Sequence, residues 1–263
     1  KATLRRLKGD GYADPSINRV LVYLRAAFAD AIESRIIDRK DDPTAGIKRR
    51  SEPSRTRFLN PHNGELSRFV KAVELEPCAT SRDAVIMALL SGLRKNDLLG
   101  LTWANIDLDA GTISYTAQKT GDDLVHNLSP DALDRLHRRS EWRDGEVERL
   151  RREGHQDRAE AIARWVFPSP RPSCTSRLFD IQKPVKRAAK AAGIDDLRVH
   201  DLRRTYGSLA IMGGVPIEVV GQSLGHRPGS DATQVYARAI ENPVANVASF
   251  VADAVNASRR SAS

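Results

Sequence analysis

The sequence predicts a mainly helical protein with one small three-stranded antiparallel sheet, an α+β fold class. Apolar residues recur with helical period along most of the chain, whereas strand signals are confined to residues 103–128. In that region, segments rich in turn residues at 107–111 and 118–122 separate three short runs typical of strands. Two tight connections between three short strands predict an antiparallel meander.

The first helix signal is Asp14-Pro15-Ser16, a capping side chain followed by proline in the first turn. Apolar residues then follow helical period as far as Ile32, which predicts a helix with one buried face. The charged, proline-containing stretch 38–57 predicts an interdomain linker. Its basic run Lys48-Arg49-Arg50 fits either a solvated linker or a contact to phosphate.

Helical period returns after the linker and predicts most of the remaining elements. Gly92 is expected to end one of these helices as its C-terminal cap. The stretch 139–164 is rich in Arg and Glu with a thin apolar stripe, and predicts an exposed helical excursion. The predicted helices span about 61–75, 82–92, 97–101, 131–164, 179–192, 200–212, 216–224 and 243–257.

The charge balance favours an anionic partner. Lys and Arg total 42 against 34 Asp and Glu, a formal charge of +8, and nucleic acid is the usual partner of such a chain, although many basic proteins bind none. Because no apolar run approaches the roughly 20 residues that span a bilayer, no membrane partner is expected. Cys78 and Cys174 form no C-x-x-C pair and predict free thiols in a reducing cytoplasm. The chain starts at Lys1 without an initiator Met, so we expect a piece of a longer protein.

Five sites along the chain carry possible chemistry, and the first two lie before residue 120. Arg94 follows a predicted helix end, where its planar fork of donors can face a phosphate, and Asp97 can orient it or a neighbour. Lys119 lies in a turn between strands, where its ammonium can enter a groove and protonate a leaving oxygen. Taken alone, Arg94 is better explained by a local surface ion pair, and Lys119 by its contribution to solubility.

The other three sites lie in the last third of the chain. His200 and Arg203 share one face of a predicted helix near its electropositive N-terminus, where both can contact one anion. His226 follows Gly225, which we expect to end a helix, and is thus placed to donate to a phosphate oxygen. A capping or core histidine is the usual alternative, and Tyr236 beside Val and Ala is by itself typical of a core residue.

Together these residues suit attack on a phosphodiester. The hydroxyl of Tyr236 would be the nucleophile, and the two arginines with His226 would stabilise the charge of a five-coordinate transition state. Lys119 would protonate the departing 5′ oxygen, while His200 would deprotonate Tyr236 or bind phosphate. The complete set, in chain order, is Arg94, Lys119, His200, Arg203, His226 and Tyr236, with Asp97 in support.

These motifs resemble the tyrosine recombinase (phage integrase) family. SGLRKNDLLGLTWANID resembles its first arginine box, VHDLRRTYGSLAIMGGVPIEVVGQSLGH its second, and TQVYARA its tyrosine box. The resemblance implies a tyrosine recombinase catalytic domain over 58–258. Three departures leave every catalytic group in place: Asp97 where Glu is commoner, a lengthened loop 227–232, and the charged excursion.

The resemblance also implies domains, activity and partners. Residues 17–49 resemble the last helix and exit of the family's core-binding domain, so 1–50 would be the end of that domain plus a linker. The implied activity is site-specific recombination or integration of a mobile element through a 3′-phosphotyrosine, without metal or cofactor. The implied partners are double-stranded DNA, an excision or architectural factor, and a homotetramer on two DNA sites, in the bacterial cytoplasm at the nucleoid.

Three points stay open. The apolar stripe from Val244 to Val255 either packs on its own domain or docks on a neighbouring protomer, as the resemblance implies. A type IB topoisomerase would use similar active-site chemistry and relax DNA without site preference. A catalytically inactive, DNA-binding relative is the third hypothesis, against which the intact Tyr236 and both arginines argue.

Overall fold

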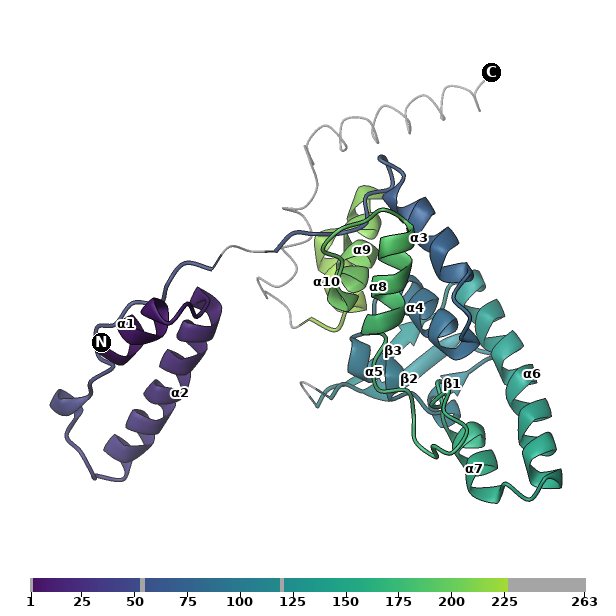
Figure 1. The fold of residues 1–263 in the computed structure, drawn as a ribbon, viewed down its shortest axis with the longest axis horizontal. Helices are drawn as coiled ribbons and strands as arrows, with labels where there is room; N and C mark the ends of the chain where they lie inside the picture. The colour runs from purple at the N-terminus through teal and green to yellow at the C-terminus, as the bar shows by residue number, and fades with distance from the viewer. Residues whose placement is uncertain (1, 53–54, 119–120, 227–263) are drawn as a thin grey trace. The chain divides into compact units, whose positions relative to one another are not determined.

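A computed structural model of the chain describes residues 2–52, 55–118 and 121–226 (Figure 1). Contacts divide the chain into two compact units, Lys1–Arg55 and Thr56–Ser263, and each is described by itself. Lys119, Tyr236, the loop 227–232 and the helix expected at 243–257 lie outside the described residues.

The first unit contains α1 (Ala2–Gly9), α2 (Asp14–Glu33) and a 3-10 turn, η1 (Arg39–Asp41). The helix starts at Asp14 as expected, with proline in the first turn, but the expectation that Asp14 caps it is wrong, because the N-cap is Ala13 and no side chain caps the helix. Leu4, Ile17 and Leu21 form a small core between α1 and α2. Only the first half of the apolar stripe on α2 is therefore buried, and α1 was not predicted from the sequence.

The chain after η1 packs back on α2. The side chain of Asn18, which is 1% exposed, donates to the main-chain oxygen of Arg50 at 2.9 Å and accepts from its N–H at 2.8 Å. Ile47 also packs against the small core. Much of the stretch expected to be a linker thus belongs to the first unit, because one buried amide satisfies both polar groups of a main-chain residue.

The second unit is built around α4, which is buried along most of its length and packs against α3, α5, α6, α8 and α9. Phe69, Met87, Leu98 and Leu202 are 0% exposed in the common core. The helices expected within the described residues are confirmed, with ends shifted by a few residues and with 131–164 divided into two helices. They are α3 (Glu65–Glu74), α4 (Ala79–Ser91), α5 (Lys95–Leu99), α6 (Pro130–Arg152), α7 (Gln156–Arg164), α8 (Gln182–Ala191), α9 (Val199–Met212) and α10 (Ile217–Ser223). Residues Trp103–Asn105, expected to begin the first strand, instead form a 3-10 turn, η2, in which the side chain of Asn105 accepts from the N–H of Thr102 at 2.8 Å.

The sheet is the expected antiparallel meander in the order β1-β2-β3. Its strands are β1 (Ile106–Asp107), β2 (Thr112–Thr116) and β3 (Asp123–Asn127), with Ile113 paired to His126 and Tyr115 to Leu124. Inward-facing Ile113 and His126 are buried, whereas Ser114 and Val125 face solvent. The connection between β2 and β3 carries Lys119, and the register fixes where the chain leaves β2 and enters β3.

The charged excursion is a helical hairpin formed by α6 and α7 (teal in Figure 1). Val147, Leu150, Ala159 and Ile162 form its own small core, as the thin apolar stripe predicts. The expectation of an exposed segment is wrong for Arg139, which is 4% exposed. The reason is that its guanidinium finds polar partners on neighbouring elements.

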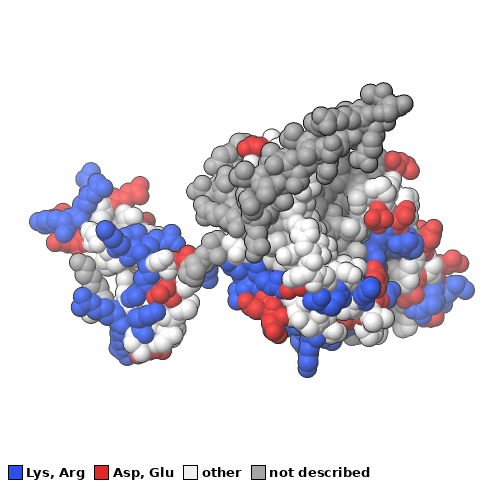
Figure 2. All heavy atoms as spheres, turned by 90° about the horizontal axis from the view of Figure 1, so that it is seen from above, with Lys and Arg blue, Asp and Glu red and all other residues white. Residues whose placement is uncertain are grey.

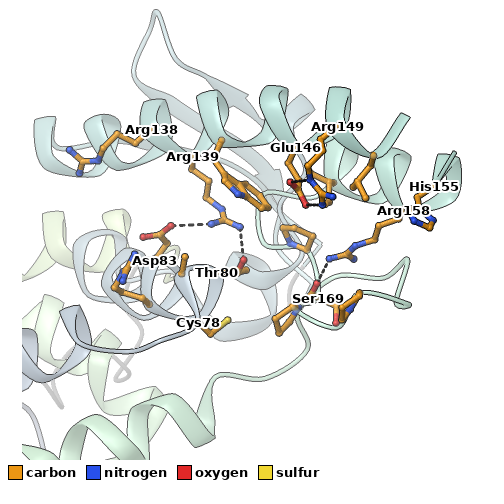
Figure 3. Close-up of a pocket in the computed structure, with 18 of the residues that line it drawn as sticks. Cys78, Thr80, Asp83, Arg138, Arg139, Glu146, Arg149, His155, Arg158 and Ser169 are labelled. Carbon is orange, nitrogen blue, oxygen red and sulfur yellow. Dashed lines mark hydrogen bonds and ion pairs between the residues drawn. The ribbon is translucent and has the colours of Figure 1, made fainter. Parts of the chain in front are cut away.

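A pocket of about 1140 Å³ lies between the hairpin, the start of α4 and the loop 168–173 (Figure 3). Arg139 donates to Asp83 at 3.0 Å, to Thr80 at 3.1 Å and to the main-chain oxygen of Val166. Other arginines that line the pocket are paired as well, for example Arg149 with Glu146. Of the predicted catalytic residues that the structure describes, none lines this pocket, and its charged side chains hold neighbouring elements together.

Replacing Arg139 by Ala is expected to lower the free energy of unfolding by about 2–5 kcal/mol, since it leaves a cavity and buried polar groups without a donor. The matched control is Arg138→Ala on the exposed neighbour, expected within about 0.5 kcal/mol of wild type. Urea denaturation measures both. Equal, small losses in the two variants would show that the buried guanidinium does not hold the hairpin.

Candidate active site

Gly92 ends α4 and lets α9 approach closely. Its φ of 63° is left-handed, and a Cβ there would lie 2.5 Å from Cδ1 of Tyr206 on α9. Only glycine meets both conditions, so the expected helix end at Gly92 is confirmed for a physical reason. Arg94 follows two residues later as the N-cap of α5. It thus lies close in the chain to Gly92, the residue against which α9 packs.

Arg203 on α9 is 4% exposed and held by main-chain oxygens. Its Nη1 donates to Gly92 O at 2.8 Å, and its Nη2 donates to Leu224 O. Nη2 also lies 3.0 Å from Nε2 of His226. Because a guanidinium has donors only, Nε2 accepts and the ring proton is on Nδ1. The donor expected of His226 is therefore Nδ1, because Nε2 is engaged by Arg203.

Arg94 reaches the same turn. Its Nη2 donates to Gly225 O at 3.3 Å, next to the oxygen that Arg203 uses. Gly225 has φ 61°, and a Cβ there would lie 2.6 Å from Cδ1 of Leu124 on β3. The expected end of the helix at Gly225 is thus confirmed, and this turn gathers Arg94, Arg203 and His226.

Asp97 is 5% exposed and orients the neighbouring hairpin more than it orients Arg94. Its Oδ1 accepts from the N–H of Gln118 at 3.0 Å, one residue before Lys119. Its Oδ2 lies 3.9 Å from Nη1 of Arg94. Within the described residues, neither of these two buried atoms has a hydrogen-bond partner, so the site holds unused donor and acceptor capacity.

His200 lies in the first turn of α9, on the helix that carries Arg203. It is exposed at the surface, yet desolvation, followed by the positive charges of Arg204 and Arg203, lowers the pKa of His200 to about 4. The imidazole is therefore neutral at pH 7 and able to accept a proton. Asp201 supports this turn, since it accepts from the N–H of Arg198 at 2.9 Å and from Arg204 at 2.7 Å.

Sequence reasoning missed Tyr115 on β2. The pKa of its hydroxyl is raised, first by burial and then by the negative charge of Asp97. The positive charges of Arg203 and Arg94 oppose this shift. It therefore lies within the electrostatic reach of the site. No sequence motif marks Tyr115, because the alternating pattern of a strand is the same whether or not the strand lies beside a functional site.

The described residues offer neither a cluster of metal ligands nor a membrane-spanning helix. Basic and acidic side chains are interspersed on the face seen in Figure 2, so no patch of one sign explains the net charge there. In the described ranges, no three His, Cys, Asp or Glu side chains gather as metal ligands would. Of the helices described, none has the length and apolar character needed to cross a membrane.

Residues 62–242 match the model of the phage integrase family, which is more than half of the chain. This chain belongs to the phage integrase family. The match spans Arg94, Lys119, His200, Arg203, His226 and Tyr236, and the family's activity is site-specific cleavage and religation of DNA.

Two curated relatives illustrate the similarity of this integrase-family chain. Tyrosine recombinase XerA of Thermococcus kodakarensis is 27% identical over 238 residues, 89% of this chain and 74% of the relative. The integrase of Salmonella phage P22 is 28% identical over 200 residues, 72% of this chain and 45% of the relative. The chain thus spans less than half the length of the P22 protein.

Solved structures share the fold at lower identity. A lambda integrase tetramer bound to a Holliday junction has a TM-score of 0.65 at 22% identity, covering 89% of this chain and 62% of that one. The Tn1549 transposon integrase in complex with circular intermediate DNA has a TM-score of 0.65 at 18% identity, covering 89% and 78%. The predicted recombinase catalytic fold, mainly helical with a three-stranded sheet, is confirmed.

Proposed function

We propose that this chain is the catalytic part of a site-specific recombinase that integrates or excises a mobile element. One observation carries the assignment of the site: in a chain of the phage integrase family, Arg94, Arg203 and His226 converge on the turn at Gly225. Two guanidinium groups and an imidazole at one turn suit a phosphate with growing negative charge.

Cleavage then follows from the chemistry of the six residues. Tyr236 Oη attacks the phosphorus while the bond from phosphorus to the 5′ oxygen breaks, which leaves a 3′-phosphotyrosine ester and a 5′ hydroxyl. The phenol proton passes to His200, whose low pKa keeps it neutral beforehand. Lys119 supplies the proton that the 5′ oxygen takes up. Attack by the 5′ hydroxyl of a partner strand reverses these steps and frees Tyr236.

The contact from Asp97 to Gln118 supports the role of Lys119. A buried carboxylate that accepts from the preceding main-chain N–H fixes where the loop leaves β2. The two arginines would bind the non-bridging oxygens, and Nη1 of Arg94, which has no hydrogen-bond partner among the described residues, is a donor that such an oxygen can satisfy. No step in this scheme calls for a metal or cofactor.

The proposal extends to domains and assembly. Residues 1–50 would be the end of a core-binding domain with its linker, and 58–258 the catalytic domain. The active form would be a homotetramer on two double-stranded DNA sites, at the nucleoid, with the C-terminal helix docked on a neighbouring protomer. The lambda integrase tetramer bound to a Holliday junction supports the assembly, and an excision or architectural factor would set its direction.

Covalent capture tests the function. The whole protein that contains this chain is mixed with fragments of host DNA and denatured, and DNA that stays attached is sequenced together with the modified peptide. We expect adducts on a few related sequences, attached through the peptide that contains Tyr236. Adducts spread over all sequences would indicate a topoisomerase, and no adduct would indicate an inactive DNA-binding relative.

A further inference from the structure

Oxygens of the main chain accept hydrogen bonds from both of the proposed catalytic arginines. Arg203 donates to Gly92 O and Leu224 O, and Arg94 donates to Gly225 O. The direction of both guanidinium groups therefore depends on where two short turns sit, the one after α4 and the one after α10. Anything that fixes these turns also fixes the site.

The ring of Tyr206 packs against the first of these turns. It leaves no room for a side chain at Gly92, since a Cβ there would lie 2.5 Å from Tyr206 Cδ1 and 2.9 Å from Leu224 Cδ2. Both Gly92 and Leu224 carry an oxygen that holds Arg203. Tyr206 is on α9 three residues after Arg203. The same helix therefore carries the guanidinium and the ring that packs against the two residues whose oxygens accept from it.

The hydroxyl of Tyr206 ties the second turn to α9. Tyr206 Oη lies 3.0 Å from Oγ of Ser223, the last residue of α10 and the one before Leu224. Val220 of α10 and Leu224, which follows the helix, pack against Tyr206 as well. One tyrosine thus contacts both turns, one through its ring and one through its hydroxyl.

His126 joins the sheet to the same place. It is 6% exposed on β3, and its ring lies 6.3 Å from the ring of Tyr206 at 52°. Burial lowers the pKa of His126, and a hydrogen bond to the main chain of Ser223 opposes this. Two residues before it, Leu124 packs on Gly225. The strand that follows the Lys119 loop is therefore attached to the turn that holds the arginines.

We propose that Tyr206, Ser223 and His126 are positioning residues that hold the two arginine-binding turns and couple them to the β2–β3 hairpin. The inference rests on the proposed roles of Arg94 and Arg203. None of the three residues touches the reacting atoms, and they act through Gly92, Leu224 and Gly225.

The first test is a double-mutant cycle on the hydroxyl pair. Tyr206→Phe and Ser223→Ala each remove one partner, and each is expected to slow single-turnover cleavage by about 2- to 10-fold at saturating DNA. The double variant should be no slower than either single one, because the same interaction is lost once. The control is Ser208→Ala, which removes a hydroxyl of α9 without a partner among the described residues and should cleave at the wild-type rate. Unchanged rates, or additive losses, would overturn the proposal.

The second test separates positioning from stability. A substrate with a methyl group in place of one non-bridging oxygen is uncharged at the reacting phosphorus, so it depends less on the arginines. The defect of Tyr206→Phe and Ser223→Ala should shrink on this substrate. A defect of equal size on both substrates, or one that follows a fall in Tm, would mean that the network only supports the fold.

A third measurement does not use activity. In the protein without DNA, hydrogen exchange at the guanidinium of Arg203, followed by NMR, should be at least about 2-fold faster in Tyr206→Phe and Ser223→Ala than in Ser208→Ala. Faster exchange in a protein that cleaves no DNA would uphold the network and refute the proposed function. Unchanged exchange would refute the network whether or not DNA is cleaved.

Discussion

Tyr236→Phe is expected to abolish the covalent DNA adduct. Phenylalanine keeps the ring but lacks the oxygen that would become the ester, so no phosphotyrosine can form. Loss of a nucleophile in another well-studied enzyme costs on the order of 10⁶-fold in rate. A loss of that size would leave too little adduct to detect. The measurement is adduct yield on a cleavable site, with DNA affinity followed in parallel and expected to change little.

The matched control for this prediction is Tyr12→Phe, which removes a hydroxyl from a tyrosine that is 53% exposed in the first unit. Its adduct yield should equal that of wild type. If Tyr236→Phe still formed an adduct at the wild-type rate, the nucleophile would be another residue, and the attached peptide would identify it.

Arg203→Lys is expected to lower the cleavage rate by about 10²–10³-fold, the usual cost of losing one preorganised donor to a transition state. Lysine keeps the charge, but its single ammonium cannot bridge Gly92 O and Leu224 O while it also faces His226. Single-turnover cleavage at saturating DNA is the measurement, because it removes any effect of weaker binding.

The comparison variant for Arg203→Lys is Arg187→Lys, at an arginine whose side chain is 58% exposed and paired with Glu76. It should cleave within about 2-fold of wild type, as expected for a surface pair worth under 1 kcal/mol. A wild-type rate in Arg203→Lys would mean that charge alone is required, and that the fork held by the two turns has no part in catalysis.

The sequence determined the fold class and the helix ends for local reasons. Helical period and turn residues act over a few neighbours, so they predicted the meander, the glycine stops at Gly92 and Gly225, and the apolar stripe of the hairpin. Local signals failed where burial decided the outcome, as at Arg139. The sequence predicts a solvated charge there, but the side chain is buried and pairs with Asp83, which lies far away in the chain.

The sequence also supplied the candidate members of the site, because the chemistry of a charged or nucleophilic side chain is set by its residue type. Only the tertiary structure decided how they are held. The oxygens of Gly92, Leu224 and Gly225 belong to the backbone that every residue has, so no motif marks them as ligands of Arg94 and Arg203. The same holds for Tyr206, which is an ordinary half-buried aromatic residue until α4, α9 and α10 meet around it.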